Sequence, residues 1–302
     1  MTDYLDPIAG LVDRKSSITV LSGSDCANFL NRSLTSDISE FTHMERHDSV
    51  LCDANGRVID IASLCRLDDK ILMLSQSQGE ITRKRLQSGI SWSEDVSIID
   101  GNNALTHLTL TGMQWQRALI GIGLDPEDLG DNVWVEFGNM LISLNRDFDV
   151  DIIDIALPTN EVLEVTSALI DNGCRKMGDD RWDYVRTNIG LVTIEEANGR
   201  IPADVSLGSF IDLNKGCYPG QEIHARMDSR GKSAKHIVRF RANRPIEIGK
   251  HMVEGIGRIL VISSIEYNGK SVGFAIIPHG VSIDGQFEID GNSTLIEHII
   301  SP

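Results

Sequence analysis

Residues 214–232 read NKGCYPGQEIHARMDSRGK, and this stretch carries the most information in the chain. Cys217 lies in it between Gly216 and a tyrosine, and Pro219 and Gly220 follow directly. Two glycines and a proline within five residues predict a tight turn on the surface, because these residues supply the backbone angles that turns need. We therefore expect the Cys217 thiol on an exposed loop and not in a core strand.

The sequence neighbours of Cys217 favour a reactive thiol. A cysteine becomes nucleophilic when its thiolate is stabilised, and nearby cations do this. Lys215, Arg226 and His224 are close enough in sequence to supply them. In the alternative interpretation Cys217 is one more small buried residue, which is the usual state of a free cysteine. The glycine and proline context favours the functional thiol.

Upstream of this loop the chain alternates between strand and helix patterns. VLCDANGRVID (50–60) places Asn55-Gly56 between two apolar runs and predicts a β-hairpin, because both residues tolerate positive φ. Helices that interrupt antiparallel hairpins predict an α+β fold, not a doubly wound sheet. Further strands are predicted at 17–21, 70–75, 107–111 and 152–157, a second hairpin at 133–144, and helices at 26–34, 78–87, 161–170 and 180–188.

The pattern changes after about residue 235. No helical pattern fits beyond this point, and roughly seventy all-β residues predict a small barrel or sandwich. The length of 302 residues also favours more than one domain, since single cores stop growing near about 250 residues. Strands are predicted at 235–241, 257–264, 271–277 and 285–289, with short glycine-containing turns between them.

The charge of the chain is strongly acidic, with 28 basic and 44 acidic residues and a net charge of −16. Such a chain repels polyanions, so we expect no direct binding to nucleic acid or to anionic membranes. Between Lys215 and Lys250, however, nine basic and three acidic residues give a net charge of +6. This basic island is either a site for an anion or a strand and loop that balances acidic neighbours.

The five cysteines include no C-x-x-C pair, which predicts reduced thiols and neither a disulfide framework nor a zinc knuckle. His43 and His47 have helical metal-site spacing but no third ligand, so no metal site is predicted. The opening MTDYLDPIAG lacks the features of a secretory signal. No apolar run approaches the ~18 residues that span a bilayer. We expect a cytoplasmic protein.

The motif KGCYPGQE (215–222), followed by Ala225-Arg226, strongly resembles the signature of the YgfZ-like folate-binding proteins, which are relatives of the glycine-cleavage T-protein (aminomethyltransferase). The resemblance covers about residues 17–280. SITVLSGSDCANFLNRSLTSDI is similar to the opening strand and helix of that family, and LCDANGRVID to its hairpin. IDIALP (153–158) is similar to the strand with a pterin-binding Glu, and WDYVRTNIGLV to a helix with matched Trp, Arg and Gly.

This resemblance implies a fold and a ligand. The fold would be two ferredoxin-like α+β modules plus a C-terminal β-barrel, arranged as a three-lobed ring around a central channel. Residues 1–234 would form the α+β region, as interleaved modules of about 1–120 and 121–234, and residues 235–302 the barrel. The ligand in the channel would be tetrahydrofolate or a one-carbon derivative. The change of pattern near residue 235 agrees with the last boundary independently.

The resemblance also implies site residues. Asp154 stands where the family has its pterin-binding Glu, and Arg186 or the basic island would meet the anionic folate tail. Asp60 stands at the first position of a carboxylate pair that the aminomethyltransferases use. The Cys loop would supply Cys217 and Lys215 for chemistry and Tyr218, Gln221, Glu222 and Arg226 for ligand binding.

One departure from the aminomethyltransferases bears on function. Their second Asp is replaced here by Ile61, so the chain lacks one carboxylate for proton transfer and gains Cys217. YgfZ-like members are linked to the upkeep of iron–sulfur enzymes, including those that modify tRNA. The resemblance thus implies a folate-binding accessory protein with iron–sulfur client proteins. The alternatives are a folate-dependent aminomethyltransferase or demethylase using Asp60 or Asp154, and a binding module without folate.

Overall fold

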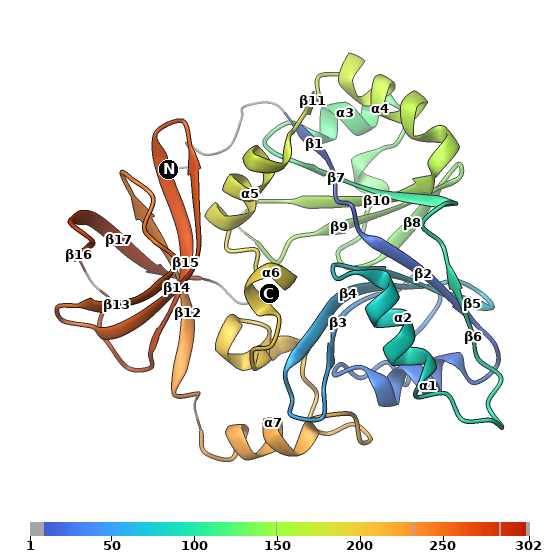
Figure 1. The fold of residues 1–302 in the computed structure, drawn as a ribbon. Coiled ribbons are helices and arrows are strands. Elements are labelled where there is room, and N and C mark those ends of the chain that lie inside the picture. The colour runs from blue at the N-terminus through green and yellow to red at the C-terminus, as the bar shows by residue number, and fades with distance from the viewer. Residues whose placement is uncertain (1–8, 149, 232, 284, 300–302) are drawn as a thin grey trace.

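The computed structural model describes residues 9–148, 150–231, 233–283 and 285–299. This part of the chain forms three β-sheets, with helices on the outer faces of the first two and a segment of short helices between the second and third (Figure 1). The mixed α+β class predicted from the sequence is confirmed. Among the described residues, no helix combines the length and apolar character needed to cross a bilayer.

The first sheet takes all its strands from residues 17–100. Helices α1 (Cys26–Ser33) and α2 (Gly79–Gln87) cover one of its faces, which confirms both predicted helices. Because side chains alternate along a strand, the opposite face is also apolar and packs against the second sheet. Its strand order is β3 (Arg46–Cys52), β4 (Val58–Arg66), β5 (Lys70–Ser75), β2 (Ser17–Ser22) and β6 (Ser97–Asp100).

The hairpin predicted at 50–60 is confirmed as β3–β4, but its turn differs from the expected two-residue loop. Gly56 has φ +70°, whereas Asn55 is not among the residues with positive φ. The Asp53 carboxylate accepts hydrogen bonds from the amides of Asn55 and Arg57, at 2.8 and 2.9 Å. The Asp53 side chain thus mimics a backbone turn within a longer loop between the paired residues Cys52 and Val58, and in this loop only Gly56 adopts the left-handed region.

The second sheet combines the N-terminal strand with residues 105–176. Strand β1 (Gly10–Asp13), which the sequence patterns did not predict, lies between β7 and β11. Helices α3 (Trp115–Gly121) and α4 (Val162–Asp171) cover one face, and α4 confirms the predicted helix. The strand order is β11 (Arg175–Lys176), β1, β7 (Leu105–Thr111), β10 (Ile152–Pro158), β9 (Met140–Asn145) and β8 (Trp134–Phe137).

The third sheet is curled like half of a barrel and takes its strands from residues 235–298 (Figure 1). Its edge strands β13 and β16 approach each other, and His251 on β13 lies 3.0 Å from the Asp290 carboxylate beyond β16. The strand order is β13 (Gly249–Val253), β14 (Gly257–Tyr267), β15 (Lys270–Pro278), β12 (Lys235–Ala242), β17 (Asn292–His298) and β16 (Gln286–Ile289).

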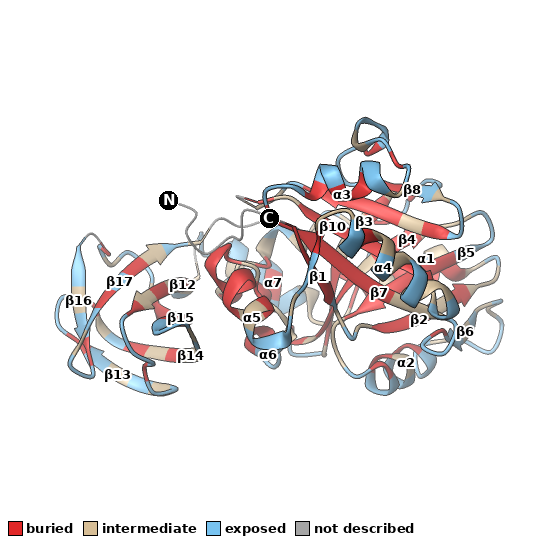
Figure 2. Cartoon of the chain, turned by 90° about the horizontal axis from the view of Figure 1, so that it is seen from above, coloured by how far each residue is buried: buried red, intermediate tan, exposed pale blue. Residues whose placement is uncertain are grey.

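Residues 179–228 connect the second and third sheets. Helix α5 (Asp179–Asn188) packs on β14 and β15 and confirms the predicted helix. Figure 2 shows buried residues along the strands of the first two sheets and on α5. Helix α6 (Ile194–Ala197) and short turns at Pro202–Val205 and Gly208–Phe210 follow. Helix α7 (Gln221–Asp228) begins inside the motif, where the sequence indicated only a turn.

Candidate functional site

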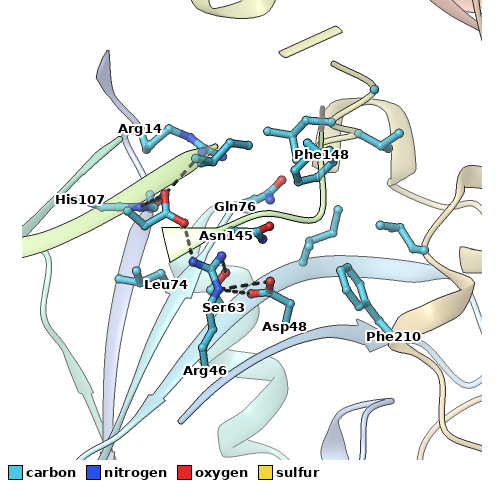
Figure 3. A pocket seen from close by; sticks show the side chains of 18 of the residues that line it. Arg14, Arg46, Asp48, Ser63, Leu74, Gln76, His107, Asn145, Phe148 and Phe210 are labelled. Atoms are coloured by element: carbon cyan, nitrogen blue, oxygen red, sulfur yellow. Dashed lines mark hydrogen bonds and ion pairs between the residues drawn. The ribbon is translucent and has the colours of Figure 1, made fainter. Parts of the chain in front are cut away.

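A cavity lies where the first two sheets meet the segment 190–210 (Figure 3). Its apolar wall includes Leu74 of β5, together with Phe148 and Phe210 from connecting segments. Polar side chains from β3, β7 and β10 converge near Leu74, across the cavity from Phe148 and Phe210 (Figure 3). Largely apolar walls with a few converging polar groups are typical of a small-molecule site.

Asp154 is placed at this cavity by the alternation of side chains along β10. Ile153 and Ile155 point into the core beneath α3 and α4, so Asp154 faces the opposite side. Its Oδ1 accepts hydrogen bonds from His107 Nε2 at 3.0 Å and from Thr109 Oγ1 at 2.7 Å. Its relative exposure is only 4%, and a carboxylate at such depth requires partners of this kind.

Arg46 joins the two sheets across the cavity. Its NH1 donates to Asp154 Oδ2 at 2.9 Å, and its Nε lies 3.3 Å from the Asp48 carboxylate. Arg46 and Asp48 are two residues apart on β3, so both side chains face the same side of the sheet. Ser63, opposite Asp48 on β4, accepts a further Arg46 hydrogen bond at 3.2 Å. No sequence pattern predicted a role for Arg46 or Asp48.

The electrostatics of this group fix its protonation. Burial alone would raise the pKa of Asp154, but Arg46, His107 and Arg14 hold that pKa well below its ordinary value. Burial lowers the pKa of His107 against the pull of the carboxylate. A neutral His107 then donates through Nε2 to Asp154 and accepts at Nδ1 from Ser16 Oγ, 2.8 Å away. Asp154 is therefore an anion, and both of its carboxylate oxygens already accept hydrogen bonds from neighbouring side chains.

Arg186 occupies a different environment from the one predicted. Its guanidinium is buried and pairs with Glu196 at 3.1 Å and with Asp183 at 2.6 Å. Burial lowers the pKa of Arg186, but Glu196 and Asp183 raise it to a net increase. The side chain borders a neighbouring hollow beside Trp182, not the Asp154 cavity. Its predicted contact with a folate tail stays a prediction, which this pairing does not favour.

Asp60 is also buried, and its carboxylate is hydrogen-bonded. Its carboxylate accepts hydrogen bonds from the amides of Ile61, Gln76 and Ser77 and from Thr82 Oγ1, at 2.7 to 3.1 Å. Burial raises the pKa of Asp60 against these hydrogen bonds. Its neighbours Ile61 and Gln76 line the cavity, whereas Asp60 itself is not among the lining residues. The geometry places Asp60 behind the wall of the site.

The Cys217 thiol is exposed, as the turn pattern predicted. The other four cysteines are buried. Lys215 does not direct its charge at the sulfur: its Nζ donates to the carbonyls of Leu34 and Ser36, at 2.8 and 2.5 Å. Burial lowers the pKa of Lys215 to about 8. Lys215 thus fastens the loop to the turn after α1.

A second fastening holds the loop against the β3–β4 hairpin. His224 on α7 donates through Nε2 to the Gly56 carbonyl at 2.9 Å, and its Nδ1 accepts from the Tyr218 hydroxyl at 3.2 Å. Gln221 donates to the Lys215 carbonyl at 3.3 Å. Tyr218 and His224 are buried. Glu222 and Arg226, by contrast, are exposed on α7.

The Cys loop and the cavity are connected through one irregular segment, residues 210–215. Phe210 lines the cavity, and its carbonyl accepts a hydrogen bond from Thr35 Oγ1 at 2.7 Å. The Asp212 amide donates to the Thr35 carbonyl at 3.0 Å. The segment from the cavity wall to Lys215 is therefore held along residues 34–36, although Cys217 itself is not among the cavity-lining residues.

The basic island divides into two parts. Arg239 and Arg241 pair with Glu297 on the neighbouring strand, at 3.1 and 3.0 Å, which fits the charge-balancing interpretation. Lys232 lies outside the described residues. Lys215 makes the hydrogen bonds described above. The remaining basic residues are exposed: Arg226, Arg230, Lys235, Arg244 and Lys250.

Comparison with known proteins agrees with the resemblance in the motif. No family model matches the chain. The chain is 25% identical over 243 residues to the tRNA-modifying protein YgfZ of Klebsiella pneumoniae (strain 342), covering 78% of this chain and 73% of that protein. It is 23% identical over 261 residues to a chloroplastic protein of Arabidopsis thaliana described as a candidate transferase, covering 84% of this chain but only 57% of the plant protein.

Among solved structures, the chain is similar to the glycine cleavage system aminomethyltransferase T from Bartonella henselae. The TM-score is 0.83 at 19% identity, over 99% of this chain and 87% of that one. At this level of identity the similarity shows the fold. The chain is thus similar to YgfZ over most of its length and has the fold of the glycine-cleavage T-protein.

Proposed function

We propose that this chain binds tetrahydrofolate, or a one-carbon derivative, in the Asp154 cavity and supports the assembly or repair of iron–sulfur enzymes, including tRNA-modifying ones. Cys217 would be its working thiol. The observation that carries the folate proposal is the buried group of Arg46, Asp154 and His107 facing an apolar-walled cavity. The similarity to YgfZ supports the accessory role.

The donor and acceptor set of the cavity fits a pterin. A planar, weakly apolar ring with N–H groups along one edge needs apolar faces and a carboxylate acceptor. Phe148, Phe210 and Leu74 provide the apolar walls. Asp154 accepts hydrogen bonds of 2.7 to 3.0 Å from three residues, whereas Asp48 is held more weakly, with both oxygens 3.3 Å from Arg46 Nε. We infer that Asp48 is the acceptor for the pterin and that Asp154 orients Arg46. Direct contact between Asp154 and the pterin was the sequence-based prediction.

The anionic tail of a folate requires cations. Arg14 and Arg46 both line the cavity, and guanidinium groups bind carboxylates through paired hydrogen bonds. We propose that Arg14 takes the role first predicted for Arg186, because the Arg46 guanidinium already contacts Asp154, Asp48 and Ser63. Arg14 is itself held over the Trp182 ring, 4.8 Å from the ring centre, which fixes its direction.

Titration of the purified protein with tetrahydrofolate, followed by calorimetry, tests the ligand. We expect saturable binding by the wild type and at least tenfold weaker binding by Asp48→Asn, which removes the charge but keeps the size. Asp68→Asn, at an exposed carboxylate outside the cavity, is the matched control and should bind like the wild type. Absence of saturable binding at millimolar ligand would remove folate from the proposal and favour the binding module without it.

The role of Cys217 is tested separately from the ligand. Because the thiol is exposed and is not among the cavity-lining residues, Cys217→Ala should keep tetrahydrofolate affinity and stability. It should abolish support of iron–sulfur enzyme activity in cells that depend on this protein. Full support by the variant would exclude the thiol from the function. Cys174→Ala, at a buried cysteine beneath the second sheet, controls for loss of a cysteine.

A folate-dependent aminomethyltransferase or demethylase is the second candidate, and the shared fold favours it. Such an enzyme needs a carboxylate near the reacting carbon to move a proton. Asp60 is enclosed by four donors and does not line the cavity, which supports the accessory role over the enzyme. An assay for methylene-tetrahydrofolate formation from an aminomethyl donor distinguishes them, since turnover would establish the transferase.

A further inference from the structure

Three histidines meet at one end of the third sheet. His236 lies on β12, His279 follows β15, and His298 ends β17. The His236 ring stacks on that of His298, with centroids 5.2 Å apart and an angle of 26°. The His279 ring meets it edge-on at 5.4 Å. We call these residues the histidine cluster.

Among the residues that the structure describes, the central imidazole has no hydrogen-bond partner. Both ring nitrogens of His236 are buried without a donor or acceptor, which a neutral ring tolerates far better than a charged one. The described residues contain no group of three His, Cys, Asp or Glu side chains arranged to hold a metal ion. In this arrangement the cluster is therefore not a metal site.

The charged groups around the cluster do not compensate a proton on it. On the 202–205 turn, Asp204 accepts a hydrogen bond from Ser233. On β17, Glu297 is paired with Arg239 and Arg241 of β12. Lys235, next to His236 on β12, is exposed. The groups that act on His236 are His298 and His279, and both disfavour its charge. Burial, the largest influence, also lowers the pKa of His236.

The cluster faces the segment that forms one wall of the ligand cavity. Ala203, Ser206 and Gly208 lie across a hollow from the three histidines. Ser206 lines both this hollow and the Asp154 cavity. Leu207 and Phe210, from the same segment, line the Asp154 cavity. Val205 and Ile237, the residue after His236, are buried in the same apolar cluster. Residues 203–210 therefore separate the histidine cluster from the Asp154 cavity.

We propose that the histidine cluster is a proton-sensitive junction, which holds residues 203–210 against the third sheet when the His236 imidazole is neutral and releases them when His236 takes up a proton. Two observations support this: within the described ranges neither His236 nitrogen has a hydrogen-bond partner, and the His298 and His279 rings pack against the His236 ring. The junction does not depend on any ligand.

The direction of the pH dependence follows from linkage. A histidine whose folded pKa is depressed contributes stability that is fully present above its unfolded pKa, near about 6.5, and is lost as pH falls towards the folded pKa. The junction should therefore be closed at pH 7.5 and weaken below about pH 6.5. Each proton taken up on opening changes the opening equilibrium by at most about tenfold per pH unit.

Hydrogen exchange of the full chain without ligand tests this. At pH 7.5 and 5.0, after correction for intrinsic exchange, the amides of residues 203–210 should lose protection in the wild type by about tenfold or more. His236→Phe keeps an aromatic ring, needs no hydrogen bond, and should keep that protection at pH 5.0. His251→Phe, at the far edge of the third sheet, should behave like the wild type. Equal pH-dependent loss in His236→Phe and the wild type would overturn the proposal.

A second variant covers the case in which His236→Phe does not fold. The double variant His279→Asn, His298→Asn leaves His236 in place and removes both neighbouring imidazoles at exposed positions. It should show a smaller loss of protection at residues 203–210 between pH 7.5 and 5.0 than the wild type. An unchanged loss in this variant would likewise contradict the junction.

Discussion

Gly220, in the loop that carries Cys217, lies directly against Gly56 at the tip of the β3–β4 hairpin. A Cβ atom on Gly220 would come within 2.3 Å of Gly56 Cα and 2.9 Å of the Asp53 carbonyl oxygen. Gly220 also has φ +84°, a conformation that other residues rarely adopt. The position of the loop therefore depends on two glycines that are far apart in the sequence.

Replacement of Gly220 by alanine should displace the Cys loop. The clash is with backbone atoms, which cannot rotate away, and the left-handed backbone adds strain, so we expect a loss of about 1–3 kcal/mol in the free energy of unfolding. Gly216→Ala is the control, because nothing lies within 4 Å of its Cβ position. Urea unfolding of both variants measures the difference, and equal stability would contradict the close approach.

Alkylation of the native protein should modify Cys217 alone. Burial raises the pKa of Cys26 and Cys174 to about 11 and of Cys52 and Cys65 to about 12, and those four thiols are also shielded from reagent. Mass spectrometry after brief treatment with iodoacetamide at pH 7.5 should find one labelled site, and five sites after unfolding. Labelling of any buried cysteine at a comparable rate would show that its sheet opens readily.

Removal of the Asp154 charge should destabilise the protein. Asp154→Asn leaves Arg46 buried with part of its pairing lost, which costs about 3–5 kcal/mol in comparable buried pairs. Because the folded pKa of Asp154 is depressed, its contribution is present above the unfolded pKa near about 3.9 and is lost as pH falls further. Unfolding at pH 7 and pH 3 measures both effects. A variant as stable as Asp68→Asn at pH 7 would refute this account.

Substitution of Arg46 by lysine should weaken ligand binding more than it weakens the fold. Lysine keeps the charge but cannot contact Asp154, Asp48 and Ser63 together from one planar group. We expect at least a tenfold loss of tetrahydrofolate affinity by calorimetry. Arg32→Lys, at an ion pair with Glu94 away from the cavity, serves as the control. Parallel losses in the two variants would show that the effect is not local.

Removal of the Lys215 cation should loosen the Cys loop without unfolding the protein. Lys215→Met keeps the apolar stem but leaves the Leu34 and Ser36 carbonyls without this donor, so the amides of residues 214–218 should exchange several-fold faster. Lys215→Arg should restore much of the protection. Since burial lowers the folded pKa of Lys215 to about 8, the cost of burying its charge is relieved as pH rises from 8 towards its unfolded pKa.

Local patterns in the sequence predicted the elements that depend on neighbouring residues. The Asn55-Gly56 hairpin, α1, α2, α4 and α5 were all predicted, because turn residues and helical periodicity lie within one short window. Strand β1 was not, since four residues carry too little pattern and its partners are β7 and β11. Helix α7 was hidden by the Pro219-Gly220 turn that begins it.

The candidate site was predictable only in part for a similar reason. Asp154 was identified through one motif, but the residues that engage it come from β3 and β7, far away in the sequence. The Arg46–Asp48 spacing on a strand was the available signal, since two charged residues on one face of a buried strand require an explanation. Arg186 was predicted to bind a ligand because spacing reveals an arginine but not the carboxylates that enclose it.

The position of β1 between β7 and β11 sets an order of events during synthesis on the ribosome. Residues 10–13 are translated well before both strands that flank them, at 105–111 and 175–176. The first sheet, complete by residue 100, is free to form while residues 10–13 are still unpaired. A nascent chain therefore exposes an unpaired edge of β1 until translation passes Lys176. Unpaired strand edges promote aggregation, so we expect chaperone binding in this interval.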